Sequence, residues 1–321
     1  MNRFHHFDVV AAWYADYLAT RGYRPRTIAA YRFELSFFRR YLAAETTADD
    51  LEELDTTLVQ GYITWLYRGD RAPATIHHKC AALVNFFGAL YEENKFYRDL
   101  RTAITLPKIG KRLPTGMLSE EEMRTLFIHL ERSVDLPAIR SLEEAICMRD
   151  LAMMEILYST GMRLSELIGL RLDDIKSSDG LTHIRDGKGG WDRIVPIGEH
   201  ALAATMRYIR DTRPLLVGRT PTDALLLSRR GTPTSMQCIR DSLARVLRRA
   251  GINRHITVHG IRHTCATHLL NNGADIRYAQ QLLGHKCLSS TQVYTRISIA
   301  KLKDTHNTFH PREREENRND Q

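Results

Sequence analysis

The sequence has few of the features that would place it outside the reducing interior of a cell. It contains only 5 cysteines in 321 residues, and no two of them form a C-x-x-C pair. Widely spaced cysteines in odd number argue against a disulfide framework and indicate reduced thiols. Long apolar runs are also missing, since none approaches the roughly 20 residues that span a bilayer, and residues 1–10 lack the apolar stretch of a secretory signal. We therefore expect a cytoplasmic protein with no membrane contact.

Acidic residues are scarce in one long segment of the chain. The whole sequence carries 46 Lys and Arg against 38 Asp and Glu, for a formal net charge of +8. Residues 1–106 are balanced, with 13 basic and 13 acidic side chains, whereas residues 229–303 contain 13 basic side chains and only 2 acidic ones. A solvated basic face is the simple explanation. An excess this one-sided favours a surface that binds nucleic acid.

Apolar periodicity predicts that the first third of the chain is helical. Val10, Trp13, Tyr14, Tyr17 and Leu18 recur at the spacing of one helix face. Residues 106–114 then contain two prolines, a glycine and three basic side chains with no acidic one. That composition is typical of a linker between two domains.

A second domain is predicted to begin at Ser119, which can form a capping box with Glu122. Two β-rich runs, residues 181–185 and 193–197, flank a glycine-rich turn, and this arrangement predicts a hairpin. Helical patterns occupy most of the remainder. Beyond Pro311 the chain is charged and has no apolar residues, so we expect it to be mobile.

The stretch TVHGIRHT at residues 257–264 is the most informative part of the sequence. On a helix, His259 and Arg262 are i, i+3 neighbours and project from one face. A guanidinium can bind two oxygens of a phosphate diester while an imidazole moves a proton. Taken alone, H-x-x-R is common and is typical of a structural pair.

Other residues strengthen the case for phosphate chemistry. Arg163 follows a predicted helix stop at Gly161, and His285 follows Gly284 in the same way. Tyr294 lies nine residues after His285, within a polar segment. A tyrosine buried in the core is the simple alternative for Tyr294.

With these residues, the sequence resembles the tyrosine recombinase (phage integrase) family, especially its Xer-type members. The resemblance covers nearly the whole chain and includes residues 301–312, which are similar to Xer-type C-termini. The active-site set of the family is Arg, Lys, His, Arg, His or Trp, and Tyr, in that order. It is matched in order by Arg163, Lys188, His259, Arg262, His285 and Tyr294.

The resemblance implies a mainly α fold with a small antiparallel β-sheet, arranged as a two-domain C-shaped clamp around DNA. The expected domains are a helical core-binding (SAM-like) domain at residues 1–106, a basic linker at 107–117, a tyrosine recombinase catalytic domain at 118–310 and a mobile charged tail at 311–321. Basic residues expected to contact DNA are Arg24, Arg26, His77, Lys79, Lys108, Lys111 and Arg112. A solvated surface role fits each of the first four equally well.

The family also implies a role for each matched residue. Tyr294 is the nucleophile, and its attack leaves a 3′-phosphotyrosyl link and a free 5′-hydroxyl. Arg163 and Arg262 bind the nonbridging oxygens, and His285 donates a third hydrogen bond. The remaining two residues move protons: His259 assists proton removal from the phenol, and Lys188 protonates the departing oxygen. Glu166 is expected to be structural and to hold an arginine. No cofactor, metal or nucleotide is required, because one phosphate ester replaces another of similar energy.

The expected partner is double-stranded DNA with specific recombination sites. Four protomers would act on two sites through a Holliday junction, as a homo-tetramer or as a hetero-tetramer with a related recombinase. The tail around residues 302–309 is expected to dock into a neighbouring protomer. DNA integration or excision, dimer resolution and transposon resolution all remain open.

Four other interpretations compete with this one. Zinc could bind the cluster of His259, His263, Cys265, His268, His285 and Cys287, but H-E-x-x-H and paired C-x-x-C motifs are absent. A P-loop fails because the glycine-rich segment at residues 187–190 lacks the required upstream glycine. A type IB topoisomerase would use similar chemistry without exchanging partners. A DNA-binding repressor would lack the chemistry altogether.

Overall fold

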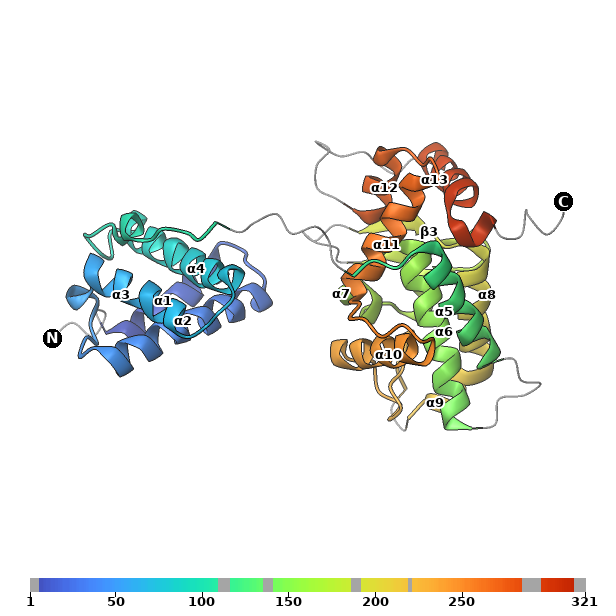
Figure 1. The fold of residues 1–321 in the computed structure, drawn as a ribbon, viewed down its shortest axis with the longest axis horizontal. Helices are drawn as coiled ribbons and strands as arrows, with labels where there is room; N and C mark the ends of the chain where they lie inside the picture. Colours follow the sequence, from blue (N-terminus) through green and yellow to red (C-terminus); the bar gives the residue numbers. More distant parts are fainter. Residues whose placement is uncertain are drawn as a thin grey trace. The chain divides into compact units, whose positions relative to one another are not determined.

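The computed structural model describes residues 6–108, 116–134, 141–185, 192–218, 221–284 and 296–314. Contacts divide the chain into unit 1, Met1–Arg112, and unit 2, Leu113–Gln321, and both units are predominantly helical (Figure 1). Within the described ranges, no helix is both long enough and apolar enough to cross a bilayer.

Unit 1 is a bundle of helices around an aromatic core. Its main helices are α1 (Phe7–Thr20), α2 (Pro25–Glu45), α3 (Thr56–Arg68) and α4 (Pro73–Glu92). Proline opens both α2 and α4, where its missing N–H has no helical partner to lose. The Phe7 ring meets the rings of Phe38 and Phe86 edge-to-face, with centroids 5.6 and 5.9 Å away. These buried contacts join α1, α2 and α4.

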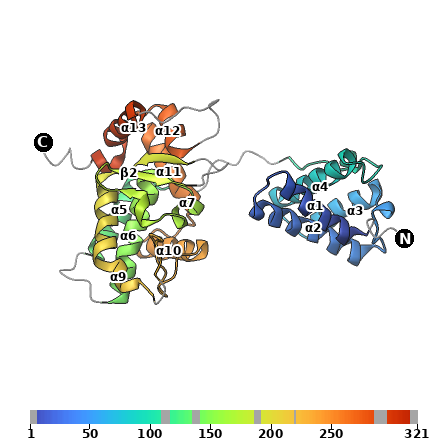
Figure 2. The same cartoon turned by 180° about the vertical axis from the view of Figure 1, so that it is seen from behind.

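Unit 2 is organised around one buried helix. Its elements are α5 (Glu120–Arg132), α6 (Leu142–Thr160), α7 (Leu164–Ile168), β1 (Ile175–Lys176), β2 (Leu181–Ile184), β3 (Arg193–Pro196), α8 (Glu199–Arg207), α9 (Arg213–Leu216), α10 (Met236–Arg249), α11 (Val258–Asn271), α12 (Ile276–Leu283) and α13 (Arg296–Phe309). Every residue of α6 from Met148 onward is buried, because α5, α8 and α11 pack around it (Figure 2). Ser119 and Glu122 form the predicted capping box at the start of α5.

The sheet of unit 2 has three antiparallel strands in the order β1-β2-β3. The pairing of β2 with β3 confirms the predicted hairpin strands, and Ile184 lies opposite Arg193. The short strand β1 adds a third member that was not predicted. The fold is therefore mainly α with a small antiparallel sheet, as expected.

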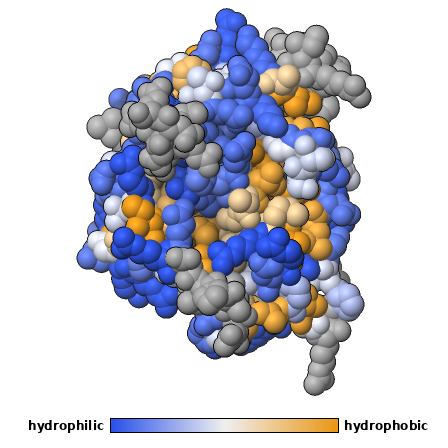
Figure 3. All heavy atoms as spheres, turned by 90° about the vertical axis from the view of Figure 1, so that its right-hand side faces the viewer, coloured by the Kyte–Doolittle hydropathy of each residue, from blue (hydrophilic) through white to orange (hydrophobic). Residues whose placement is uncertain are grey.

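Helix α10 presents basic side chains at the surface of unit 2. On α10, Ile239, Leu243 and Val246 face the core, while Arg240 and Arg248 are exposed. Figure 3 shows the face of unit 2 that lies on the right in Figure 1, where hydrophilic residues surround several hydrophobic patches. The basic excess of residues 229–303 thus includes an exposed helical face.

The C-terminal helix α13 is built into unit 2. Leu302, His306 and His310 are all buried, and α13 packs against β3 of its own chain. His306 Nε2 donates to the Ser159 carbonyl at 2.9 Å, and His310 Nε2 donates to the Tyr158 carbonyl at 3.1 Å. In this single chain, the segment expected to dock into a neighbour occupies its own protomer.

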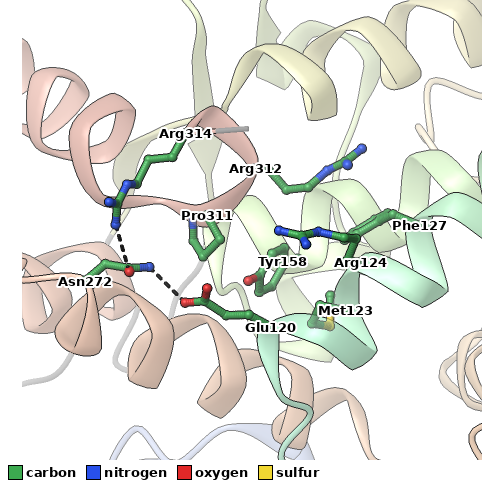
Figure 4. Close-up of a pocket in the computed structure, with 9 residues that line it drawn as sticks. All are labelled: Glu120, Met123, Arg124, Phe127, Tyr158, Asn272, Pro311, Arg312 and Arg314. Atoms are coloured by element: carbon green, nitrogen blue, oxygen red, sulfur yellow. Dashed lines mark hydrogen bonds between the residues drawn. The ribbon is translucent and has the colours of Figure 1, made fainter. Parts of the chain in front are cut away.

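The expectation of a mobile tail from Pro311 onward is wrong for residues 311–314. These residues form a further helical turn, and Arg312 donates to both Glu131 and Glu155 at 2.5 Å. Arg314 donates to Asn272 at 2.8 Å (Figure 4). The buried carboxylate of Glu155 and the exposed one of Glu131 hold this charged segment, and composition alone does not show them. Residues 315–321 lie outside the described ranges.

Candidate active site

Helix α11 carries two of the predicted catalytic residues on its first two turns. Thr257 caps the helix by accepting a hydrogen bond from the Gly260 N–H at 3.0 Å. His259 is exposed, whereas Arg262 is only 4% exposed. The Arg262 guanidinium donates to the Gly161 carbonyl at 2.7 Å and to the Leu283 carbonyl at 2.6 Å. These bonds connect α11 to the ends of α6 and α12.

Arg163 lies at the N-cap of α7, immediately after the end of α6. Its Nη1 donates to Glu166 Oε1 at 2.7 Å, and its Nη2 donates to the Gly284 carbonyl at 3.2 Å. The other Glu166 oxygen accepts from the Arg163 backbone N–H at 2.8 Å. Glu166 therefore holds an arginine, which confirms the structural role expected for it.

Two glycines allow the ends of α6 and α12 to pack closely against their neighbours. Gly161 ends α6 with φ +57°, and Gly284 ends α12 with φ +64°, so both helix stops were placed correctly from the sequence. A Cβ on Gly161 would lie 2.6 Å from a methyl carbon of Leu283. A Cβ on Gly284 would lie 3.2 Å from Arg193 Cδ. Larger residues at these positions would push α6, α12 and β3 apart.

The C-terminal end of α12 is where the arginines converge. Three consecutive carbonyls, those of Leu282, Leu283 and Gly284, accept hydrogen bonds from Arg193, Arg262 and Arg163 respectively. The terminal carbonyls of a helix lack helical partners and carry partial negative charge, so cations stabilise them. The last residues of α12 and its C-cap Gly284 thus contact both predicted catalytic arginines.

The charges of the site perturb one another. Burial, followed by the charge of Arg163, lowers the pKa of Arg262 to about 10. Partial desolvation and the nearby Arg262, His263 and Arg163 also lower the pKa of His259. Burial opposes ionisation of Glu166, but bonds and charges from Arg193 and Arg163 outweigh it and lower its pKa to about 2. The site thus combines excess positive charge with a histidine that is neutral at pH 7, which suits binding an anion and accepting a proton.

The other predicted site residues either lie outside the described ranges or differ in their exposure. Lys188, His285 and Tyr294 lie outside the described residues, as do Lys111 and Arg112 of the predicted DNA contacts. Arg24, Arg26 and Lys108 are exposed. His77 is half-buried, with its Nδ1 2.9 Å from the Pro107 carbonyl oxygen.

Lys79 is a correction to the predicted DNA contacts. It is 4% exposed, its ammonium pairs with Glu34 at 2.7 Å, and it lies 3.1 Å from the centroid of the Phe37 ring. His77 and Lys79 lie on the first turns of the same helix, His77 nearer the surface and Lys79 in the core. The sequence does not show which of the two side chains is buried. Lys79 stabilises unit 1 and is not available to DNA.

Arg193 is a component of the site that sequence reasoning missed. It is 6% exposed and donates to both carboxylate oxygens of Glu166 at 2.8 Å. In the sequence it stands only as a basic residue at the start of a β-rich run.

The described part of the chain contains no group of three metal-ligating side chains. There, His268 Nδ1 lies 2.8 Å from the Tyr158 hydroxyl.

Known proteins are similar to this chain in sequence. The chain matches the Phage integrase family over residues 117–301 and the phage integrase N-terminal SAM-like domain over residues 10–94. It is 34% identical over 304 residues to tyrosine recombinase XerD of Shewanella oneidensis, covering 95% of this chain and 97% of that protein. It is 36% identical over 301 residues to tyrosine recombinase XerC of Listeria innocua, covering 93% and 96%.

Solved structures give the same fold. A lambda integrase dimer bound to a COC′ core site has a TM-score of 0.66 at 20% identity, covering 91% of this chain and 100% of that one. XerH recombinase in a post-cleavage complex with palindromic difH has a TM-score of 0.63 at 22% identity, covering 88% and 79%. The chain therefore belongs to the phage integrase family. Within that family it is a Xer-type tyrosine recombinase, an enzyme that exchanges DNA strands.

Proposed function

We propose that this enzyme cleaves and rejoins DNA at specific sites through a covalent bond to Tyr294. The convergence of Arg163 and Arg262 at the end of α12 is the observation that supports the proposal most directly. Two guanidiniums that bond adjacent carbonyls can bind the nonbridging oxygens of one phosphate, and the added anion would offset the burial and the repulsion from Arg163 that lower the pKa of Arg262. His285 follows the same helix end and supplies a third donor.

The reaction is a balanced transesterification. The Tyr294 phenol oxygen attacks phosphorus, the bond to the 5′-oxygen breaks, and a 3′-phosphotyrosyl link forms. His259 takes the phenol proton, which its lowered pKa permits. Lys188 gives a proton to the departing 5′-oxygen. The 5′-hydroxyl of a partner strand then reverses the step, so ester energy is conserved and no cofactor is needed.

The DNA partner fits the distribution of charge. Residues 229–303 hold the basic excess, and part of it lies on the exposed face of α10. Binding that neutralises several phosphates releases counterions, so affinity should fall steeply as salt rises. Arg24, Arg26, His77 and Lys108, together with Lys111 and Arg112, are the further contacts that we propose. The two units would then close on the duplex as a C-shaped clamp.

Strand exchange requires more than one protomer. A neighbour of the same fold is a lambda integrase tetramer bound to a Holliday junction, and we propose four protomers on two sites here. They form a homo-tetramer, or a hetero-tetramer with a related recombinase. The reaction takes place in the cytoplasm and serves DNA integration, excision or dimer resolution. Docking of α13 into a neighbour requires it to leave the contacts of Leu302 and His306 with its own unit.

The test begins with covalent capture. Fragmented DNA from the source organism is incubated with the full chain, protein-linked fragments are sequenced, and the recovered site is rebuilt as a nicked duplex that traps cleaved product. Wild-type protein should form a covalent complex, whereas Tyr294→Phe should bind the same duplex and form none. Substrates with two sites should yield recombinants. Relaxed circles without recombinants would indicate a topoisomerase, and binding without a covalent complex would indicate a repressor.

A further inference from the structure

Arg193 contacts two other segments of the site from its own strand. It is the first residue of β3 and stands five positions after Lys188 in the sequence. Its two terminal nitrogens donate to the two oxygens of Glu166 at 2.8 Å each, and its Nε donates to the Leu282 carbonyl at 3.4 Å. Gly284 allows this approach, because a Cβ there would be 3.2–3.3 Å from three Arg193 atoms. One buried guanidinium therefore joins β3, α7 and the end of α12.

The pairing of Arg193 with Glu166 determines how Arg163 is held. One oxygen of Glu166, Oε1, accepts from both Arg193 and Arg163, and the other accepts from Arg193 and from the Arg163 backbone. Arg193 fixes this carboxylate through two parallel bonds, an arrangement that a guanidinium provides and an ammonium cannot. Displacement of the carboxylate would let the Arg163 guanidinium turn away from the Gly284 carbonyl and from the anion site.

We infer that Arg193 is a positioning residue, which aims Arg163 at the scissile phosphate through Glu166 without touching DNA itself. Because Arg193 is 6% exposed and bonded to a carboxylate and a backbone carbonyl, it has no role in attracting DNA. Its loss should therefore slow cleavage and leave affinity for the duplex nearly unchanged. This inference rests on the proposed phosphoryl-transfer function.

Arg193→Lys is the test variant, since it keeps the charge and removes the two-pronged bond. On the captured nicked duplex, we expect covalent-complex formation at saturating protein to slow by roughly 10- to 100-fold, as expected when transition-state donors are misplaced. The dissociation constant for DNA should change by less than about threefold. Arg185→Lys is the matched control, because Arg185 directly follows β2 and pairs with Asp174 at 2.8 Å instead of Glu166. It should cleave at the wild-type rate.

A second substrate distinguishes misplacement of the Arg163 guanidinium from a general disturbance of the fold. In a methylphosphonate duplex, one nonbridging oxygen of the scissile phosphate is replaced by methyl, so the negative charge that Arg163 stabilises is absent. The defect of Arg193→Lys should then shrink to within about threefold of wild type measured on the same substrate. Glu166→Asp, which withdraws the shared carboxylate while retaining its charge, should show the same pattern and gives a second route if Arg193→Lys fails to fold.

Three results would overturn the inference: wild-type cleavage by Arg193→Lys, an equal defect on the phosphodiester and the methylphosphonate, or a loss of DNA affinity that accounts for the slower rate. Failure of the proposed function looks different, because wild-type protein itself would then form no covalent complex on the phosphodiester.

Discussion

Replacing Arg312 by methionine should destabilise unit 2 more than any surface change of similar size. Arg312 donates to Glu155 and Glu131 at 2.5 Å, and its guanidinium lies 4.4 Å from the centroid of the Phe127 ring. Burial disfavours the charge of Arg312, but the two carboxylates outweigh that effect and raise its pKa. Glu155 is 2% exposed, so removal of Arg312 leaves a buried carboxylate without this partner.

The size of the effect follows from that burial. Breaking a buried ion pair by removing one partner costs about 3–5 kcal/mol. In a domain the size of unit 2 each kcal/mol lowers the Tm by about 2–4 °C, so the Tm should fall by roughly 6–20 °C. Calorimetry of the full chain measures this shift, and hydrogen exchange should show weaker protection of α13. The transition of unit 1 serves as an internal reference.

Two further variants make the reasoning refutable. Arg312→Met combined with Glu155→Leu should recover most of the loss, because replacing a buried ion pair by apolar side chains is often neutral. Arg314→Met removes a neighbouring guanidinium in the same pocket (Figure 4), where Arg314 bonds the neutral Asn272, and should cost about 1 kcal/mol or less. An unchanged Tm for Arg312→Met, or a double variant as unstable as the single one, would refute the ion-pair argument.

The pH dependence gives an independent check on the same variant. Burial already raises the pKa of Glu155 to about 7 with Arg312 present, well above its unfolded value of about 4.3, and loss of the arginine should raise it further. The penalty for burying its charge is then present above the folded pKa and disappears as the pH falls toward the unfolded value. The stability difference between wild type and Arg312→Met should therefore narrow as the pH falls from alkaline values to about 7 and change little below that.

Three other perturbations test separate parts of the fold. Burial lowers the pKa of His306 from 6.5 to about 4 despite its bond to the Ser159 carbonyl. The stability that neutral His306 contributes is therefore complete above about pH 6.5 and is lost as the pH falls toward 4. The loss in the free energy of unfolding amounts to about 2 kcal/mol by pH 5. In acid denaturation series His306→Asn should lose less stability over this range, and equal losses would contradict the assignment. Gly260→Ala would place a Cβ 2.4 Å from the Gly116 carbonyl oxygen and shift the adjacent His259, so cleavage should fall about tenfold with DNA affinity kept. Gly169→Ala, with contacts no closer than 3.4 Å, is its control, and equal activity of the two variants would count against the packing argument. Lys79→Met should lower the unfolding temperature of unit 1 by leaving Glu34 unpaired, with DNA affinity per folded molecule unchanged; a selective loss of DNA affinity would restore Lys79 as a contact.

The sequence alone was sufficient for the class of the protein and for much of its local structure. Helix stops at Gly161 and Gly284, the capping box of Ser119 and the hairpin strands were all predicted correctly. Each depends on interactions between residues close together in the chain, so residue type and spacing contain the necessary information. The ordered set of catalytic residues then identified the phage integrase family, and the comparisons show that the chain belongs to it.

Tertiary structure decided which charges are buried and what they pair with. Arg193 meets Glu166 across 27 positions of sequence, Lys79 meets Glu34 across 45, and Arg312 meets Glu155 across 157. In the sequence each is an ordinary basic residue, and two of the three stand in segments predicted to be a DNA contact or a mobile tail. A buried charge is stable only beside its partner, and packing of distant elements determines whether that partner is present.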